Sequence, residues 1–119
     1  MDKLDFLRQN GVDVDAGIQN MMDIETYNEI LDDFYNSIDE EVLKISSFKE
    51  NGDMPNYAIS VHAMKSNARS FGFNKLGEMA YNHEMASKAN DINFVNEHFN
   101  ELISEIQSTK VIIEKYKSM

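Results

Sequence analysis

The sequence predicts an all-α protein, folded as an antiparallel up-down-up-down four-helix bundle with a short N-terminal helical segment over one end. Apolar residues recur three and four positions apart along most of the chain, which is the spacing of amphipathic helices. β-branched residues do not alternate with polar ones, and one proline and five glycines leave long stretches free to be helical. Because the breaks between the apolar series are short, neighbouring helices are expected to be antiparallel.

The first fifth of the chain is expected to lie outside the four-helix arrangement. Residues 1–20 contain a short amphipathic piece around Leu4, Phe6 and Leu7 that stops at Gly11, and we expect this segment to cover one end of the bundle. The first bundle helix is expected over 23–50. Its apolar stripe consists of Tyr27, Leu31, Phe34, Ile38, Ile45 and Phe48.

Three further helices are expected over 54–71, 74–89 and 91–117, which completes a bundle over 23–117. Their apolar stripes are Tyr57, Val61, Met64, Ala68 and Phe71; then Leu76, Met79, Ala80 and Ala86 with His83; then Val95, Phe99, Leu102, Ile106, Ile113 and Tyr116, with Thr109 filling a gap. Asp53, Asn74 and Asp91 are candidate N-caps, Pro55 suits a first turn, and Gly72 suits a helix C-terminus.

Length and charge limit the classes of protein. A chain of 119 residues is one ordinary domain, here 1–119, and the absence of cysteine excludes disulfides and thiol chemistry. The net charge of -10 argues against nucleic acid or an anionic membrane as a partner. With no long apolar run and a charged N-terminus, a cytoplasmic protein, expected to be monomeric, is the default.

One segment departs from the acidic character of the chain. Residues 54–77 contain no aspartate or glutamate, although the whole chain has 21 acidic residues against 11 basic ones. The segment carries His62, Lys65, Ser66 and Arg69. On a helix, His62 lies roughly 140° from the middle of the apolar stripe and therefore faces water. Ser66 follows one turn later on the same face, flanked by Lys65 and Arg69.

These four residue types suit a nucleophilic histidine that carries an anion. An exposed imidazole is a nucleophile at neutral pH, and a small residue one turn away leaves its ring open to approach. Two nearby cations can neutralise a dianionic group on the ring nitrogen. The alternative is an ordinary surface histidine, with Lys65 and Arg69 as solvated cations paired with acidic residues of neighbouring helices.

The stretch "HAMKSNARSFGFNKLGEMAYNHE" resembles the signature of the histidine-containing phosphotransfer (HPt) domain of bacterial phosphorelays. The matching positions are His62, Met64, Lys65, Ser66, Gly72, Leu76, and His83 with Glu84. The stretch "GVDVDAGIQNMMDIETYNEILDDFYNSI" resembles the family's entry into its first bundle helix, so the likeness covers nearly the whole chain from Gly11. In two departures from the pattern, Ser66 replaces the usual glycine and His83 replaces a leucine as a partly buried packing residue.

The resemblance implies a phosphocarrier without autonomous catalytic activity. A receiver domain of a response regulator or of a hybrid histidine kinase would donate its aspartyl phosphate to Nε2 of His62, and a second receiver would take it. The resemblance also implies that Mg²⁺ belongs to the receiver and that the carrier needs no cofactor. Lys65 would stabilise the phosphoryl charge, Ser66 would keep the site open, and Arg69 would contact the phosphoryl group or the receiver.

Two other functions are compatible with a helical bundle of this kind. An adaptor of the same fold would bind receivers and carry no phosphate, in which case His62 is incidental. A metal- or ligand-binding bundle is disfavoured, because a di-iron bundle needs Glu-x-x-His pairs and neither His83 nor His98 has a glutamate three residues before it.

Overall fold

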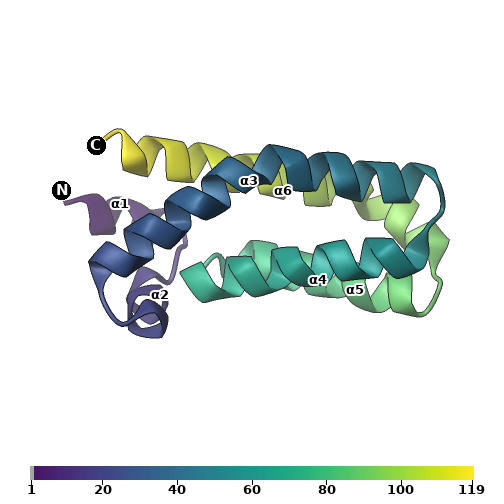
Figure 1. Ribbon diagram of the computed structural model, residues 1–119, viewed down its shortest axis with the longest axis horizontal. Helices are drawn as coiled ribbons and strands as arrows, with labels where there is room; N and C mark the ends of the chain where they lie inside the picture. The colour runs from purple at the N-terminus through teal and green to yellow at the C-terminus, as the bar shows by residue number, and fades with distance from the viewer. Residues whose placement is uncertain (1) are drawn as a thin grey trace.

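The computed structural model describes residues 2–119, which form six α-helices and no strand (Figure 1). The helices are α1 (Lys3–Gln9), α2 (Val14–Met21), α3 (Ile24–Glu50), α4 (Met54–Phe71), α5 (Asn74–Lys88) and α6 (Ile92–Lys117). The expectation of an all-α protein is confirmed, and the four long helices begin and end within a residue of the predicted limits.

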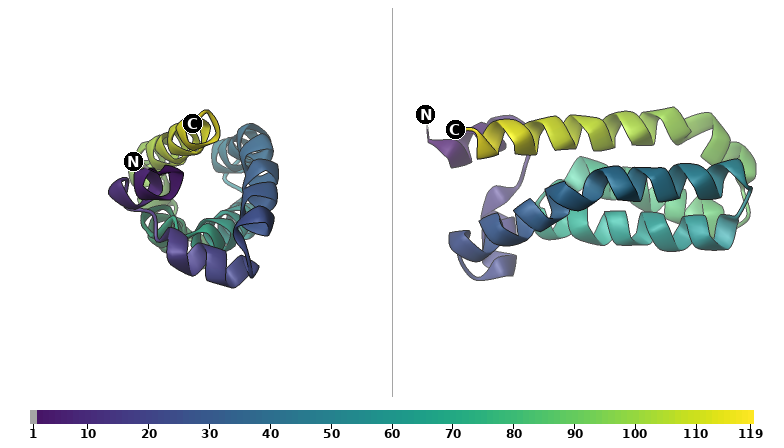
Figure 2. Two further views of the ribbon diagram at one scale, coloured as in Figure 1. Left: turned by 90° about the vertical axis from the view of Figure 1, so that its left-hand side faces the viewer. Right: turned by 45° about the horizontal axis from the view of Figure 1, so that its top comes forward.

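The four long helices lie side by side, and the elongated molecule, with α1 and α2 included, measures 43 × 23 × 22 Å. Contacts join α3 to α4, α4 to α5, α5 to α6 and α6 back to α3, and the end-on view in Figure 2 shows them around a common centre. The closest pairing is that of α4 with α5. This pairing places the helix that carries His62, α4, against the helix that carries Glu84, α5.

The predicted apolar stripes form the centre of the bundle. Most of their residues are buried, and Thr109 is buried in the gap of the last stripe. The stripe residues Phe48, Met79, Ala86 and Phe99 are only partly buried. The helix α4 is therefore held with its Val61–Met64 side against the core, and its opposite side faces outward.

Most of the helices have an aspartate as the N-cap residue. Asp23, Asp53 and Asp91 each accept a hydrogen bond from the backbone N–H three residues later, at the starts of α3, α4 and α6. The prediction that Asn74 is an N-cap is wrong. Phe73 occupies the N-cap position of α5, and its side chain makes no capping hydrogen bond. The backbone N–H of Phe73 donates to the Ala68 carbonyl at the end of α4.

The N-terminal segment contains two helices where the sequence predicted one. The helix α1 ends before Gly11 as expected, and Asp13 then caps a second short helix, α2, which packs on α3 and α4 at one end of the bundle (Figure 1). This contact is close, because a Cβ at Gly72 would lie 2.2 Å from the Asp13 carbonyl oxygen. The sequence pattern missed α2 because its eight residues show too little of a helical repeat.

Within residues 2–119, no helix combines the length and the apolarity that crossing a bilayer requires.

Candidate functional site

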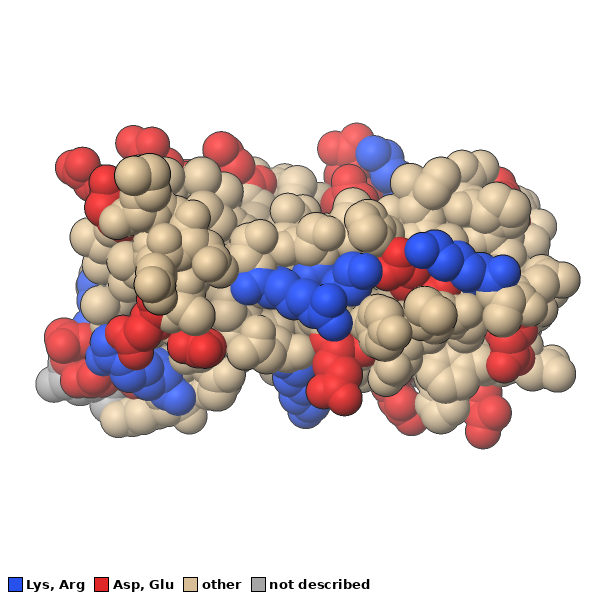
Figure 3. Space-filling model, turned by 90° about the horizontal axis from the view of Figure 1, so that it is seen from below, with Lys and Arg blue, Asp and Glu red and all other residues tan. Residues whose placement is uncertain are grey.

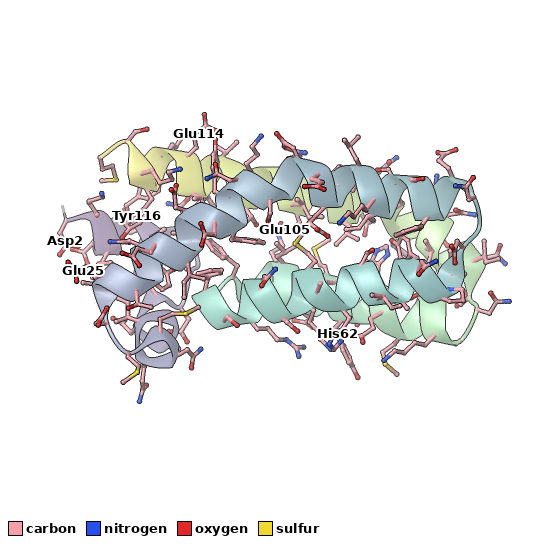
Figure 4. The ribbon with its side chains drawn as sticks, viewed as in Figure 1. Asp2, Glu25, His62, Glu105, Glu114 and Tyr116 are labelled. Carbon is pink, nitrogen blue, oxygen red and sulfur yellow. The ribbon has the colours of Figure 1, made fainter. Side chains whose placement is uncertain are left out.

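His62 projects from the outer face of α4. Its side chain is 56% exposed, as the helical spacing predicts, and Figure 4 shows it on the side of α4 that points away from α3 and α6. The neighbouring residues Val61 and Met64 point into the core and fix the rotation of the helix. The buried stripe of α4 thus determines that the imidazole faces outward.

A buried carboxylate on α5 organises the site. Oε2 of Glu84 lies 2.7 Å from Nδ1 of His62 and 2.9 Å from Nζ of Lys88, and Oε1 lies 2.6 Å from Nζ of Lys65. The Glu84 side chain is only 2% exposed. Three side chains from two helices therefore converge on a single acidic group.

The charge of Glu84 is stabilised strongly. Burial alone would raise its pKa, but the hydrogen bonds from Lys65, Lys88 and His62 outweigh burial and lower the pKa to about 2. The group is therefore ionised at neutral pH. An ionised carboxylate only accepts hydrogen bonds, so the proton between it and His62 belongs to Nδ1.

This hydrogen bond selects the tautomer of His62. With the proton on Nδ1, the lone pair of the neutral ring lies on Nε2. Within residues 2–119, Nε2 makes no hydrogen bond. In this tautomer, the exposed side chain offers the Nε2 lone pair to an electrophile that approaches from solution.

The other candidate residues of α4 take different positions. Lys65 is only 15% exposed and lies over the Tyr81 ring at 5.5 Å, in addition to its ion pair with Glu84. Arg69 is exposed and lies over the same ring at 5.5 Å, and no described contact joins it to His62 or Glu84. Ser66 is exposed one turn from His62, as predicted.

An apolar groove of about 650 Å³ runs beside His62 between α4 and α5. Its apolar wall is formed by Met54, Pro55, Ala58 and Ile59, and its polar margin includes His62, Glu84 and Lys88. Seen from this side in Figure 3, basic side chains form a band along the middle of the α4–α5 face, and most acidic ones lie nearer its margins. The groove and the imidazole are therefore open on the same face.

The other two histidines have different surroundings. His83, predicted to be partly buried, is 2% exposed, and its Nδ1 lies 2.8 Å from the Tyr57 hydroxyl. Burial lowers the pKa of His83 to about 4, so it is neutral at physiological pH. His98 is half-buried and contacts Glu101 at 3.1 Å. Among residues 2–119, no group of three His, Asp or Glu side chains could hold a metal ion.

Sequence reasoning did not assign roles to Glu84 and Lys88. The available signal was the glutamate of the matched pair on the second helix of the motif, 22 residues after His62. Because α4 and α5 are adjacent and joined by a short turn, residues at such a separation can face each other. Lys88 follows Glu84 by four residues and therefore lies on the same side of α5.

Comparison of the chain with models of known protein families, with curated proteins and with solved structures finds no match. The geometry of the site itself is consequently the basis for assigning a function.

Proposed function

We propose that this protein is a histidine phosphotransfer protein, which relays a phosphoryl group between receiver-domain aspartates through a phosphohistidine at His62. The observation that carries the proposal is the hydrogen bond of 2.7 Å between Nδ1 of His62 and the buried carboxylate of Glu84. It supports a nucleophilic role, because it holds the Nε2 lone pair outward on an exposed face. An incidental surface histidine would not require a buried, ionised partner.

The reaction that fits this arrangement is phosphoryl transfer from an acyl phosphate. The Nε2 lone pair attacks phosphorus, an N–P bond forms, and the P–O bond to the aspartyl carboxylate breaks. The aspartate leaves as a carboxylate, and the proton on Nδ1 stays in place. The ring then bears a positive charge, which the Glu84 carboxylate stabilises through the same hydrogen bond.

The partner would supply what this chain does not. A receiver domain of a response regulator or a hybrid kinase would bring the aspartyl phosphate and its Mg²⁺, and the carrier would add the nucleophile and a docking surface. Docking on the apolar groove beside His62 would place the phosphoryl group near Nε2. We propose accordingly that the protein acts as a monomer in the cytoplasm, without a cofactor and without binding nucleic acid or membrane.

The fold proposed for this function is the up-down-up-down bundle of the HPt type. Short turns join α3 to α4, α4 to α5 and α5 to α6, and the colour progression in Figure 1 reverses its direction from each of these helices to the next. Both features support an antiparallel order in which His62 and Glu84 meet halfway along the pair α4 and α5.

An adaptor that binds receivers without carrying phosphate is the second candidate. The apolar groove favours it as much as it favours a carrier, because docking alone does not need an imidazole. Incubation with a receiver domain phosphorylated on its aspartate separates the two. A carrier acquires an acid-labile label on the wild-type protein and none on His62→Gln, whereas His98→Gln, as a matched control, is labelled normally. Receiver binding with no label on the wild type would leave the adaptor.

A further inference from the structure

We infer that Lys88, on α5, is the cation that contacts the phosphoryl group on His62, and that Lys65 instead holds Glu84 in position. This inference rests on the proposed function and assigns the two lysines of the site different roles. Sequence spacing favoured Lys65 for the phosphoryl contact, since it lies one turn from His62 on the same helix.

The two amines differ in their freedom to move. Lys65 is 15% exposed, is held at 2.6 Å from Oε1 of Glu84, and lies against the Tyr81 ring. Lys88 is 59% exposed, and its contact with Glu84 is at the margin of the open groove. A lysine with an exposed, flexible stem can reorient toward a new anion, whereas a packed one loses its ion pair when it moves.

The two amines also differ in their position relative to the imidazole. Lys88 shares Oε2 of Glu84 with Nδ1 of His62, at 2.9 Å and 2.7 Å respectively, whereas Lys65 binds the other oxygen. The distance from the Lys88 amine to Nδ1 of His62 is therefore no greater than the sum of these two distances. The amine consequently lies close to the ring that carries the phosphoryl group on Nε2. Both His62 and Lys88 line the groove, and Lys65 does not.

The charges of the resting site support the same division. Two lysines face one carboxylate, which leaves one positive charge in excess when His62 is neutral. A phosphoryl group brings close to two negative charges, and the ring gains one positive charge on transfer. The phosphoryl group and the ring then carry about one net negative charge together, and the one excess cation of the site balances it. Lys88 can supply it, since Glu84 keeps Lys65 and the Nδ1 proton as partners when Lys88 moves away.

The test uses phosphoramidate as a small donor, so that receiver docking has no influence on the result. Its P–N bond breaks as the N–P bond to Nε2 forms, and ammonia leaves. We expect Lys88→Ala to lower the labelling rate of His62, and to shorten the lifetime of the phosphohistidine, by about tenfold or more. Its melting temperature should fall less than that of Lys65→Ala, because the Lys88 side chain is 59% exposed and the Lys65 side chain 15%. Lys88→Arg should recover most of the rate, and Lys75→Ala, another exposed lysine of α5 in an ion pair, should behave as wild type.

Lys65→Ala and Lys65→Met should show the opposite pattern. Both should melt at a lower temperature, because the buried carboxylate loses its least exposed lysine partner. At temperatures where circular dichroism shows them folded, both should lose less of the labelling rate than Lys88→Ala does. Lys88→Ala that labels as fast as wild type, or a folded Lys65 variant that alone loses labelling, would overturn the inference while the proposed function stands. A wild-type protein that takes no label would overturn both.

Discussion

Nδ1 of His62 lies 2.7 Å from Oε2 of Glu84, so an exposed imidazole on one helix is bonded to a buried carboxylate on the next. The exposed partner can meet a protein from solution, and the buried partner is shielded from water and from competing cations. The pair therefore combines access with a fixed ring orientation. Lys65 and Lys88 keep the carboxylate charged and make its burial tolerable.

The first prediction concerns the tautomer of His62. In the wild type at a pH where the ring is neutral, we expect the proton mainly on Nδ1, because Glu84 accepts it. Glu84→Ala removes the acceptor and should shift the proton toward Nε2. Nitrogen chemical shifts of the imidazole measure this ratio directly. Glu84→Gln keeps a carbonyl acceptor and should lie between the two, so equal ratios in all three proteins would contradict the assignment.

The second prediction concerns stability between pH 6.5 and pH 4. Burial lowers the pKa of His83 to about 4 from an ordinary value of 6.5. Between these values the unfolded chain binds a proton that the folded chain does not, so stability falls as the pH falls. The loss approaches about 3 kcal/mol if the full shift is expressed. Denaturant unfolding across this range measures it.

A matched pair of variants isolates the His83 contribution. His83→Gln keeps a polar partner for Tyr57 but cannot titrate, so its stability should depend less on pH over this interval. His98→Gln changes a half-buried histidine close to Glu101 and leaves His83 able to titrate, so it should keep most of the wild-type slope, because burial is the main cause of the His83 shift. If His98→Gln abolishes the pH dependence of stability and His83→Gln keeps it, the buried histidine is not the source of that dependence.

The third prediction concerns the contact between α2 and the end of α4. Gly72 has φ +91° and ends α4, and an added Cβ would meet the Asp13 backbone at 2.2 Å. Gly72→Ala should therefore cost about 3 kcal/mol or more of unfolding free energy, from backbone strain and displacement of the N-terminal segment together. Gly52, with φ +65° and open space around it, is the control. Gly52→Ala should cost about 1 kcal/mol; equal costs at both positions would show that the close approach is unimportant.

The sequence predicted the four long helices well because their stripes extend over many turns. Tyr27 to Ile45 and Val95 to Tyr116 repeat the apolar spacing often enough for chance to be a poor explanation. The helix α2 escaped detection because its eight residues allow only two turns, and its position depends on the close approach to Gly72, a contact distant in sequence.

The site was predictable where it depended on one helix and less so where it depended on two. The exposure of His62 follows from the angular position of one residue relative to a stripe. The role of Glu84 depends on how α4 and α5 are rotated against each other, which local spacing does not specify. Lys65 lies where the spacing puts it, but its burial is set by Tyr81 and Glu84 from the neighbouring helix.

The position of the phosphoryl group on the imidazole tests the central claim most directly. Because Glu84 holds Nδ1, we predict that the protein phosphorylated by a receiver domain carries phosphorus on Nε2 of His62. Phosphorus–nitrogen couplings in protein labelled with ¹⁵N at histidine would identify the bonded nitrogen. Coupling to Nε2, with Nδ1 still protonated, is the predicted result. Phosphorus on Nδ1, on another histidine, or on no histidine at all would contradict the account.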